Sequence, residues 1–235
     1  MRRARLLALA ALLGLASLYI GTRAGGWLSP APAVHPLTGR PIAGIATNAS
    51  WMDRAEREQE EAPAEALALI GIRPGMVIAD VGAGSGYMTM RMAPMVGPAG
   101  KVYANDIQPG LLRMLQDKAR AAHLTNVEVV LGTETETRLP EHAIDLALLV
   151  DVYHEFRRPR EMLQSISRSL KPGGELVLVE YRGEDPNVPI ARTHRMSVAD
   201  ARTEVEAEGF TFERVVPGLP RQHIIIFRTP TARKD

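Results

Sequence analysis

Seven apolar segments recur along this chain, and helix-forming segments separate most of them, which limits the folds that the chain can adopt. The apolar segments cover residues 75–82, 100–107, 126–132, 143–153, 174–182, 210–217 and 221–229. Strands that are apolar on both faces and alternate with helices form a parallel sheet that helices cover on both sides. We therefore predict an α/β fold with a Rossmann-like, doubly wound sheet of seven strands.

The last two predicted strands differ from the others in how they are connected. Only Gly218, Leu219 and Pro220 lie between them. A parallel return would need a crossover of a dozen residues or more, so these two strands are expected to form a C-terminal antiparallel β-hairpin. A helix is also expected to begin at Pro63, before the first strand, because proline is favoured in the first turn of a helix.

Composition limits the classes of function. The 235 residues are 46% hydrophobic and 23% charged, which is typical of one globular domain. The 28 basic and 27 acidic side chains leave a formal net charge of +1, so no nucleic-acid partner is expected. Cysteine is absent, which excludes disulfides, thiolate nucleophiles and thiolate metal ligands.

The N-terminal 25 residues have the pattern of a targeting segment. Three arginines precede an uncharged run over residues 6–20, and small residues follow it. We predict a signal peptide or an uncleaved signal anchor over residues 1–25, a linker or surface-packed tail over 26–50, and the folded domain over 51–235. The arginines favour an exported, periplasmic or membrane-anchored domain, with a cytoplasmic-facing anchor as the alternative.

A glycine-rich turn follows the first predicted strand. The stretch "VIADVGAGSG" ends that strand on Asp80 and then places Gly82, Gly84 and Gly86 at alternate positions. Such a turn before a helix lets a ligand approach the backbone and the free N–H groups of the helix. Tyr87 stands where a dinucleotide fingerprint has its third glycine, which argues against NAD.

Acidic residues follow two of the other strands. Asp106 ends the second strand, where a carboxylate can accept both hydroxyls of a ribose, and Asp151 ends the fourth, before "VYHEF". The fifth strand follows "LKPGG". With the glycine turn and the terminal hairpin, these motifs resemble those of the class I S-adenosylmethionine-dependent methyltransferases, from about residue 77 to residue 228.

This resemblance implies a cofactor and a set of residues that bind it. S-adenosylmethionine is the implied cofactor, and its implied binding residues are Asp80, Gly82, Gly84, Gly86, Asp106, Glu134 and Asp151. The adenine contact departs from the family pattern, because "LGTETETRLP" has no Gly-Asp pair and offers Glu134 or Glu136 instead.

The resemblance is strongest to the branch that contains ubiquinone and menaquinone methyltransferases, and it implies in-line methyl transfer to a small or lipophilic acceptor. The turn "VYHEF" lacks the Asn-Pro-Pro-aromatic motif of enzymes that methylate base or amide nitrogens. The alternative is an exported ligand- or metal-binding protein that has this fold without catalysis. Membrane association through residues 6–20 is expected, and the oligomeric state is left open.

Histidines and glutamates follow the strands whose ends meet at the predicted binding edge. His154 and Glu155 follow the fourth strand, Glu180 ends the fifth, His194 lies in the next loop, and His223 begins the last strand. We predict that His154 or His223, held by Glu155 or Glu180, is a general base and that His194 orients the acceptor. A metal site built from the same side chains is the competing interpretation, and no metal is predicted.

Overall fold

The computed structural model describes residues 33–230. The predicted signal segment, with its apolar run over residues 6–20, lies outside this range. Within the described range, no helix has the length and the apolar character needed to cross a membrane.

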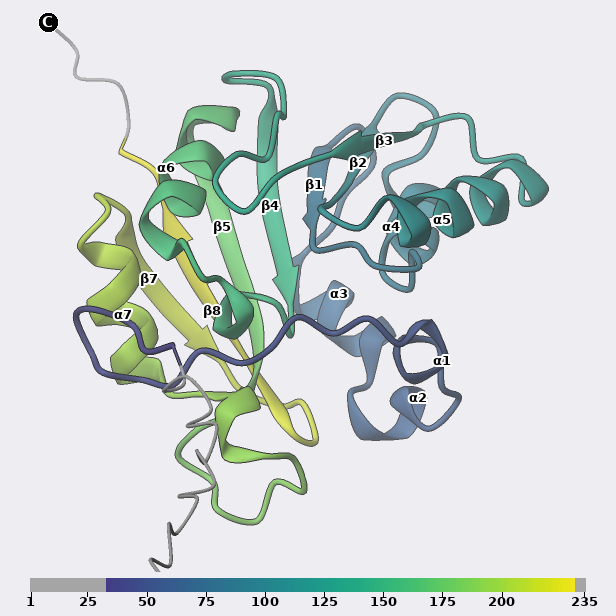
Figure 1. Ribbon diagram of the computed structural model, residues 1–235. Helices are drawn as coiled ribbons and strands as arrows, with labels where there is room; N and C mark the ends of the chain where they lie inside the picture. Colours follow the sequence, from purple (N-terminus) through teal and green to yellow (C-terminus); the bar gives the residue numbers. More distant parts are fainter. Residues whose placement is uncertain (1–32, 231–235) are drawn as a thin grey trace, which may run out of the picture. The chain divides into compact units, whose positions relative to one another are not determined.

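One mostly parallel sheet organises the described residues (Figure 1). Its strands are β1 (Val77–Val81), β2 (Lys101–Asp106), β3 (Val127–Leu131), β4 (Ile144–Val150), β5 (Leu170–Arg182), β6 (Arg195–Met196), β7 (Thr211–Val216) and β8 (Gln222–Arg228). The order is β3-β2-β1-β4-β5-β8-β7, and β6 pairs with the end of β5. Strands β1 to β5 are parallel, whereas β8 is antiparallel to both β5 and β7. The predicted fold is confirmed, and the two-residue strand β6 is an addition to the seven predicted strands.

Helices cover both faces of the sheet (Figure 1). The helices are α1 (Ala49–Met52), α2 (Arg57–Glu60), α3 (Pro63–Ile70), α4 (Thr89–Val96), α5 (Pro109–Ala121), α6 (Pro159–Ser169) and α7 (Val198–Glu206). Short 3-10 helices, η1 (Tyr153–Glu155) and η2 (Arg192–His194), follow β4 and precede β6. Helices α3 and α4 pack on one face of the sheet and α6 and α7 on the other, while α5 packs on β2 and β3.

Prolines fix where several of these helices begin. Pro63, Pro109 and Pro159 occupy the first turns of α3, α5 and α6, where the missing N–H would have no helical partner. Ser197 caps α7 by accepting a hydrogen bond from the Asp200 N–H. The helix start predicted at Pro63 therefore agrees with the structure.

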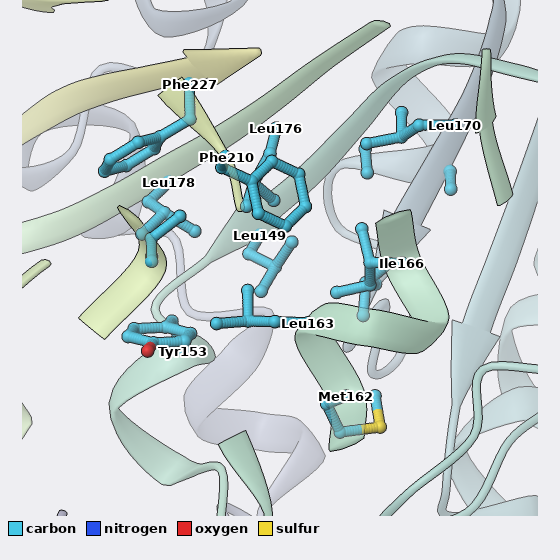
Figure 2. Packing of buried hydrophobic residues seen from close by; sticks show 14 of the residues in the cluster. Leu149, Tyr153, Met162, Leu163, Ile166, Leu170, Leu176, Leu178, Phe210 and Phe227 are labelled. Carbon is cyan, nitrogen blue, oxygen red and sulfur yellow. The ribbon is translucent and has the colours of Figure 1, made fainter. Parts of the chain in front are cut away.

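A hydrophobic cluster beneath α6 places the turn that follows β4. Leu149 of β4 and Leu178 of β5 pack with Leu163 and Ile166 of α6, as Figure 2 shows. Tyr153 is fully buried in the same cluster, at the first position of η1. Burying this ring fixes the backbone of η1, so the residue that follows it, His154, has a defined position at the sheet edge.

Residues 33–46, which we call the strap, lie against the carboxyl end of the sheet. The guanidinium of Arg40 pairs with the buried carboxylate of Glu204 on α7 at 2.9 Å. The Ala43 N–H donates to the His154 carbonyl at 3.1 Å, and the Ala46 carbonyl accepts from Gln108 Nε2 at 2.9 Å. Figure 1 shows this part of the chain in dark purple between α7 and α1. Much of the predicted linker is therefore a packed tail, one of the two forms considered for it.

Candidate active site

A cavity of about 430 Å³ opens at the carboxyl ends of the parallel strands. Its volume is in the range of small-molecule sites. One side, the cofactor side, contains the glycine turn and the acids at the ends of β1, β2 and β4. The other side, the acceptor side, contains η1, η2 and the end of the strap, and its lining includes Ile45, His154, Glu155, Phe156, Ile190 and His194.

The glycine turn has a backbone that other residues would not adopt there. Gly82 and Gly84 have φ angles of +76° and +55°, and both line the cavity. A Cβ on Gly82 would lie 2.5 Å from the Val152 side chain, and one on Gly84 would lie 2.9 Å from Met52 Sδ. Gly86 lies outside the cavity lining, and a Cβ there would lie 2.8 Å from Leu115 of α5. The structure thus gives Gly86 a packing contact and leaves its binding role a prediction.

Asp106 is held between the glycine turn and the start of α5. Its Oδ2 accepts from the Gly84 N–H and its Oδ1 accepts from the Gln108 N–H, each at 2.8 Å. Burial raises the pKa of this carboxyl against the lowering effect of these N–H donors. A carboxylate has about four acceptor positions, so it can still accept the hydroxyls of a ribose.

Two further acids lie on the cofactor side, and Asp80 is buried whereas Asp151 is half-buried. Asp80 accepts from the Thr89 hydroxyl, and burial raises its pKa to about 6. Asp151 has a φ of +54°, and its Oδ2 accepts from Gln222 Nε2 at 2.8 Å. Its Oδ1 is buried without a hydrogen-bond partner among the described residues, so a donor is needed there.

The two candidate adenine contacts have different surroundings. Glu134 lines the cavity together with Thr133. Glu136 lies outside the lining and instead pairs with Arg168 of α6 at 2.6 Å. The geometry therefore favours Glu134 over Glu136 as the residue that reaches a ligand.

A chain of three side chains connects the core to the acceptor side. Glu180 is fully buried, and its Oε1 accepts from the Tyr153 N–H at 2.9 Å. Its Oε2 lies 2.6 Å from Nδ1 of His154, and Nε2 of His154 lies 3.0 Å from Nδ1 of His194. His154 is buried, and its two ring nitrogens contact Glu180 and His194. His194 is half-buried and lines the cavity.

The two histidines differ in their affinity for a proton. Burial by itself lowers the pKa of His154, but the Glu180 carboxylate outweighs it, so the pKa is raised above that of a free histidine side chain. Burial and the neighbouring His154 both lower the pKa of His194. A proton shared by the pair is therefore more stable on His154.

Glu155 joins η1 to the strap. Both of its carboxylate oxygens lie 3.2 Å from the Ala46 N–H, and burial raises its pKa to about 7. Ligand atoms of His154, Glu155 and His194 all lie within 4.8 Å of one another, so this group has the spacing of a metal site. The metal interpretation from the sequence is therefore compatible with these positions.

His223 is not brought to the cavity. It pairs with Glu180 across β5 and β8, but it lies outside the cavity lining. Burial lowers its pKa, and its Nε2 has no hydrogen-bond partner within residues 33–230. Of the three histidines named from the sequence, the structure therefore brings His154 and His194 to the cavity but not His223.

Residues 47–61, which we call the roof, contribute a wall that sequence reasoning largely missed. Ser85 Oγ of the glycine turn donates to Asp53 Oδ1 at 2.7 Å. The Arg57 guanidinium pairs with Glu61 at 2.7 Å, and the Tyr181 hydroxyl of β5 donates to the same carboxylate at 3.0 Å. The only sequence signal was the charged run "RAEREQEE", which is equally typical of a solvated helix face.

Known proteins with similar sequences are methyltransferases. Residues 79–178 match the family model described as a methyltransferase domain. A ubiquinone/menaquinone biosynthesis C-methyltransferase UbiE from Ectopseudomonas mendocina is 29% identical over 116 residues, which are 49% of this chain and 45% of that protein. A demethylmenaquinone methyltransferase from Listeria welshimeri is 28% identical over 125 residues, 53% of this chain and 52% of that protein. The chain thus spans about half the length of these relatives.

Solved structures extend the likeness over the domain. The crystal structure of a SAM-dependent methyltransferase from Aquifex aeolicus is 26% identical with a TM-score of 0.71, and the match covers 76% of this chain and 95% of that one. The chain is thus similar to S-adenosylmethionine-dependent methyltransferases in sequence over residues 79–178 and in fold over most of the domain. The [4+2]-cyclase SpnF shares the fold alone, with a TM-score of 0.62 at 18% identity over 84% of this chain and 90% of that one. These similarities support the predicted family, enzyme class and cofactor.

Proposed function

We propose that this protein transfers the methyl group of S-adenosylmethionine to a small, lipophilic acceptor. The observation that carries the proposal is that one cavity is lined by most of the implied cofactor residues and by His154 and His194, which continue the chain from the buried Glu180. The cofactor supplies an activated methyl group, and the protein aligns the acceptor with it and excludes water.

The residues on the cofactor side fit S-adenosylmethionine. The unpartnered Oδ1 of Asp151 suits the ammonium of its amino-acid part, and Asp106 suits the ribose hydroxyls. The turn at Gly82 and Gly84 lets the ligand approach the backbone. Glu134 is the side chain available to an adenine amino group.

The lining of the acceptor side supports a lipophilic acceptor. Apolar side chains line the cavity together with His194, among them Ile45 of the strap, Phe156 after η1 and Ile190 before η2. Relatives whose names place them in ubiquinone and menaquinone biosynthesis point to the same class of acceptor. The balanced charge of the chain gives no basic field for nucleic acid.

Release of S-adenosylhomocysteine tests the proposal. Purified protein is incubated with S-adenosylmethionine and with lipophilic phenols, quinols and thiols in one series, and with DNA and RNA in another. We expect release with at least one small acceptor and none above background with nucleic acid. Cofactor binding without release in any series would support the non-catalytic binding protein, which the comparisons do not favour.

We also propose that residues 1–25 export the domain or anchor it to a membrane. The proposal rests on the three arginines that precede the uncharged run. Cell fractionation with protease protection tests it, because an exported domain is cleaved by added protease once the outer barrier is opened. Protection until the inner membrane is broken would instead place the domain on the cytoplasmic side.

A further inference from the structure

Hydrogen bonding sets which nitrogen carries the proton in each of the paired histidines. A neutral imidazole has one N–H donor and one acceptor nitrogen. The Glu180 carboxylate only accepts, so Nδ1 of His154 carries a proton and its Nε2 is an acceptor. At 3.0 Å from that Nε2, Nδ1 of His194 is then the donor, and Nε2 of His194 has a free lone pair.

We propose that the acceptor carries an ionisable O–H or S–H group and that Nε2 of His194 removes its proton while Nδ1 of His194 passes a proton to His154. This inference rests on the proposed methyl transfer and names its acceptor class and its base. His194 is the catalytic residue, and His154 and Glu180 are positioning residues. The roles expected from the sequence for His154 and His194 are thereby exchanged.

The atoms and charges balance without a further reactant. The acceptor O–H or S–H bond breaks, its proton goes to Nε2 of His194, and its electron pair stays on the acceptor atom. That atom bonds to the methyl carbon, and the electrons of the broken carbon–sulfur bond return to sulfur. The proton given up by Nδ1 of His194 leaves His154 as a cation beside Glu180.

The surroundings of the two histidines favour this direction of transfer. The buried Glu180 carboxylate raises the pKa of His154 despite its burial, so the pair stores a proton there. The pKa of His194 is lowered, so this ring is neutral when it meets the acceptor. His154 itself cannot accept from the acceptor directly, because both of its nitrogens are already in contact.

A metal ion is the competing occupant of the same place. It would bind one ring nitrogen of His154, one of His194 and the Glu155 carboxylate, since one ligand atom of each lies within 4.8 Å of the others. Both ring nitrogens of His154 already have partners in the structure, and Glu155 accepts from the Ala46 N–H. An ion would have to break these contacts, so the proton chain is favoured.

Nitrogen-15 NMR of histidine-labelled protein tests the chain without any acceptor. Above the pKa of the pair, we expect a protonated Nδ1 and an unprotonated Nε2 on both His154 and His194. In Glu180→Gln the Tyr153 N–H holds the amide oxygen, so the amide NH₂ faces Nδ1 of His154 and donates to it. The protons of both histidines should then move to Nε2, which reverses the chain.

Two controls keep this test sharp. His154→Phe is a second variant that serves if Glu180→Gln folds poorly. It removes the hydrogen-bond acceptor of His194 Nδ1, so the proton of His194 should move to Nε2. His123→Asn alters an exposed histidine with a φ of +55° and should leave both signals in place. A wild-type His194 protonated at Nε2 would overturn the proposal. If a chelator shifts the nitrogen-15 signals of both rings, the proposal is also overturned and a bound metal is supported.

Kinetics with phenols of graded acidity give a second, independent test. His194→Gln should slow the methylation of a weakly acidic phenol about 100-fold or more, the usual effect of losing a general base. A phenol that is already ionised at the assay pH needs no base and should be methylated at nearly the wild-type rate. Equal losses for both phenols would reduce His194 to a binding contact.

The pH profile separates the base from a structural role. For a weakly acidic phenol, wild-type kcat should rise with pH through a pKa above that of a free histidine side chain, because the chain must be unprotonated to accept. This rising limb should vanish in His194→Gln. Absence of methyl transfer to every acceptor would refute the proposed function, whereas the NMR result would still decide the proton chain.

Discussion

The cofactor side and the acceptor side of the cavity are built in different ways. On the cofactor side, Asp106 and the glycine turn follow the paired strands β2 and β1, and backbone N–H groups hold the carboxylate. On the acceptor side, Glu180, His154 and His194 come from β5, η1 and η2, and their contacts join side chains to one another. The cofactor side therefore depends on strand pairing and backbone hydrogen bonds, whereas the acceptor side depends on how side chains of separate segments pack.

This difference predicts that damage to the packing will affect the acceptor side first. The strap contacts η1 through Ala43 and Glu155 through Ala46. Its anchor is the buried pair of Arg40 and Glu204 on the far side of η1. Loss of the anchor should loosen the acceptor side while the glycine turn keeps its own hydrogen bonds.

The largest expected effect is that of Arg40→Met on stability. It leaves the Glu204 carboxylate buried without its cation, which costs about 3–5 kcal/mol of unfolding free energy. Chemical denaturation measures the loss. Arg120→Met is the matched control, because its pair with Asp117 is 71% and 73% exposed and should contribute less than about 1 kcal/mol. Similar losses in both variants would show that the strap is not held by Arg40.

A smaller effect is expected within the glycine turn. Gly82→Ala would place a methyl group 2.5 Å from Val152 and should cost about 1–3 kcal/mol beyond the cost of its positive φ. Gly71→Ala measures the φ cost alone, since Gly71 has a φ of +85° and nothing within 4 Å of a Cβ. Equal thermal stability of the two variants would contradict the close packing of the turn.

The smallest expected effect is on cofactor affinity, and it distinguishes Glu134 from Glu136 after β3. Glu134→Ala should weaken S-adenosylmethionine binding by about 0.5–1.5 kcal/mol, or about 2- to 10-fold, because one hydrogen bond is lost. Glu136→Ala should leave the affinity unchanged, because this side chain pairs with Arg168 outside the cavity. Fluorescence titration with the cofactor can measure both. The reverse result would assign the adenine contact to Glu136.

The sequence predicts the sheet and the cofactor side because both depend on short-range signals. Apolar strands, prolines at the starts of helices and the glycine turn all act within a few residues of where they stand. The topology then carries Asp106 and Asp151 to one edge. Gly86 shows the limit of this reasoning, since its place in the motif does not reveal that it faces Leu115.

The acceptor side was only partly predictable for the same reason. Strand order brings His154, Glu180 and His223 to one edge, but it does not say which ring faces the cavity. Burial of Tyr153 in the core turns η1 so that His154 contacts Glu180, and the loop after β5 then carries His194 to the cavity. The strap and the roof carried little sequence signal, because contacts such as Arg40–Glu204 and Ser85–Asp53 join residues far apart in the chain.

Calorimetric titration with S-adenosylmethionine tests most directly the claim that the two sides act separately in one methyltransferase site. We expect one-to-one binding by the wild type and by His194→Gln with nearly equal affinity. Asp106→Ala removes a charged hydrogen-bond partner, so its affinity should fall by about 1.5–3 kcal/mol, or about 10- to 150-fold. A wild type that does not bind the cofactor, or an Asp106→Ala protein that keeps full affinity, would contradict the account.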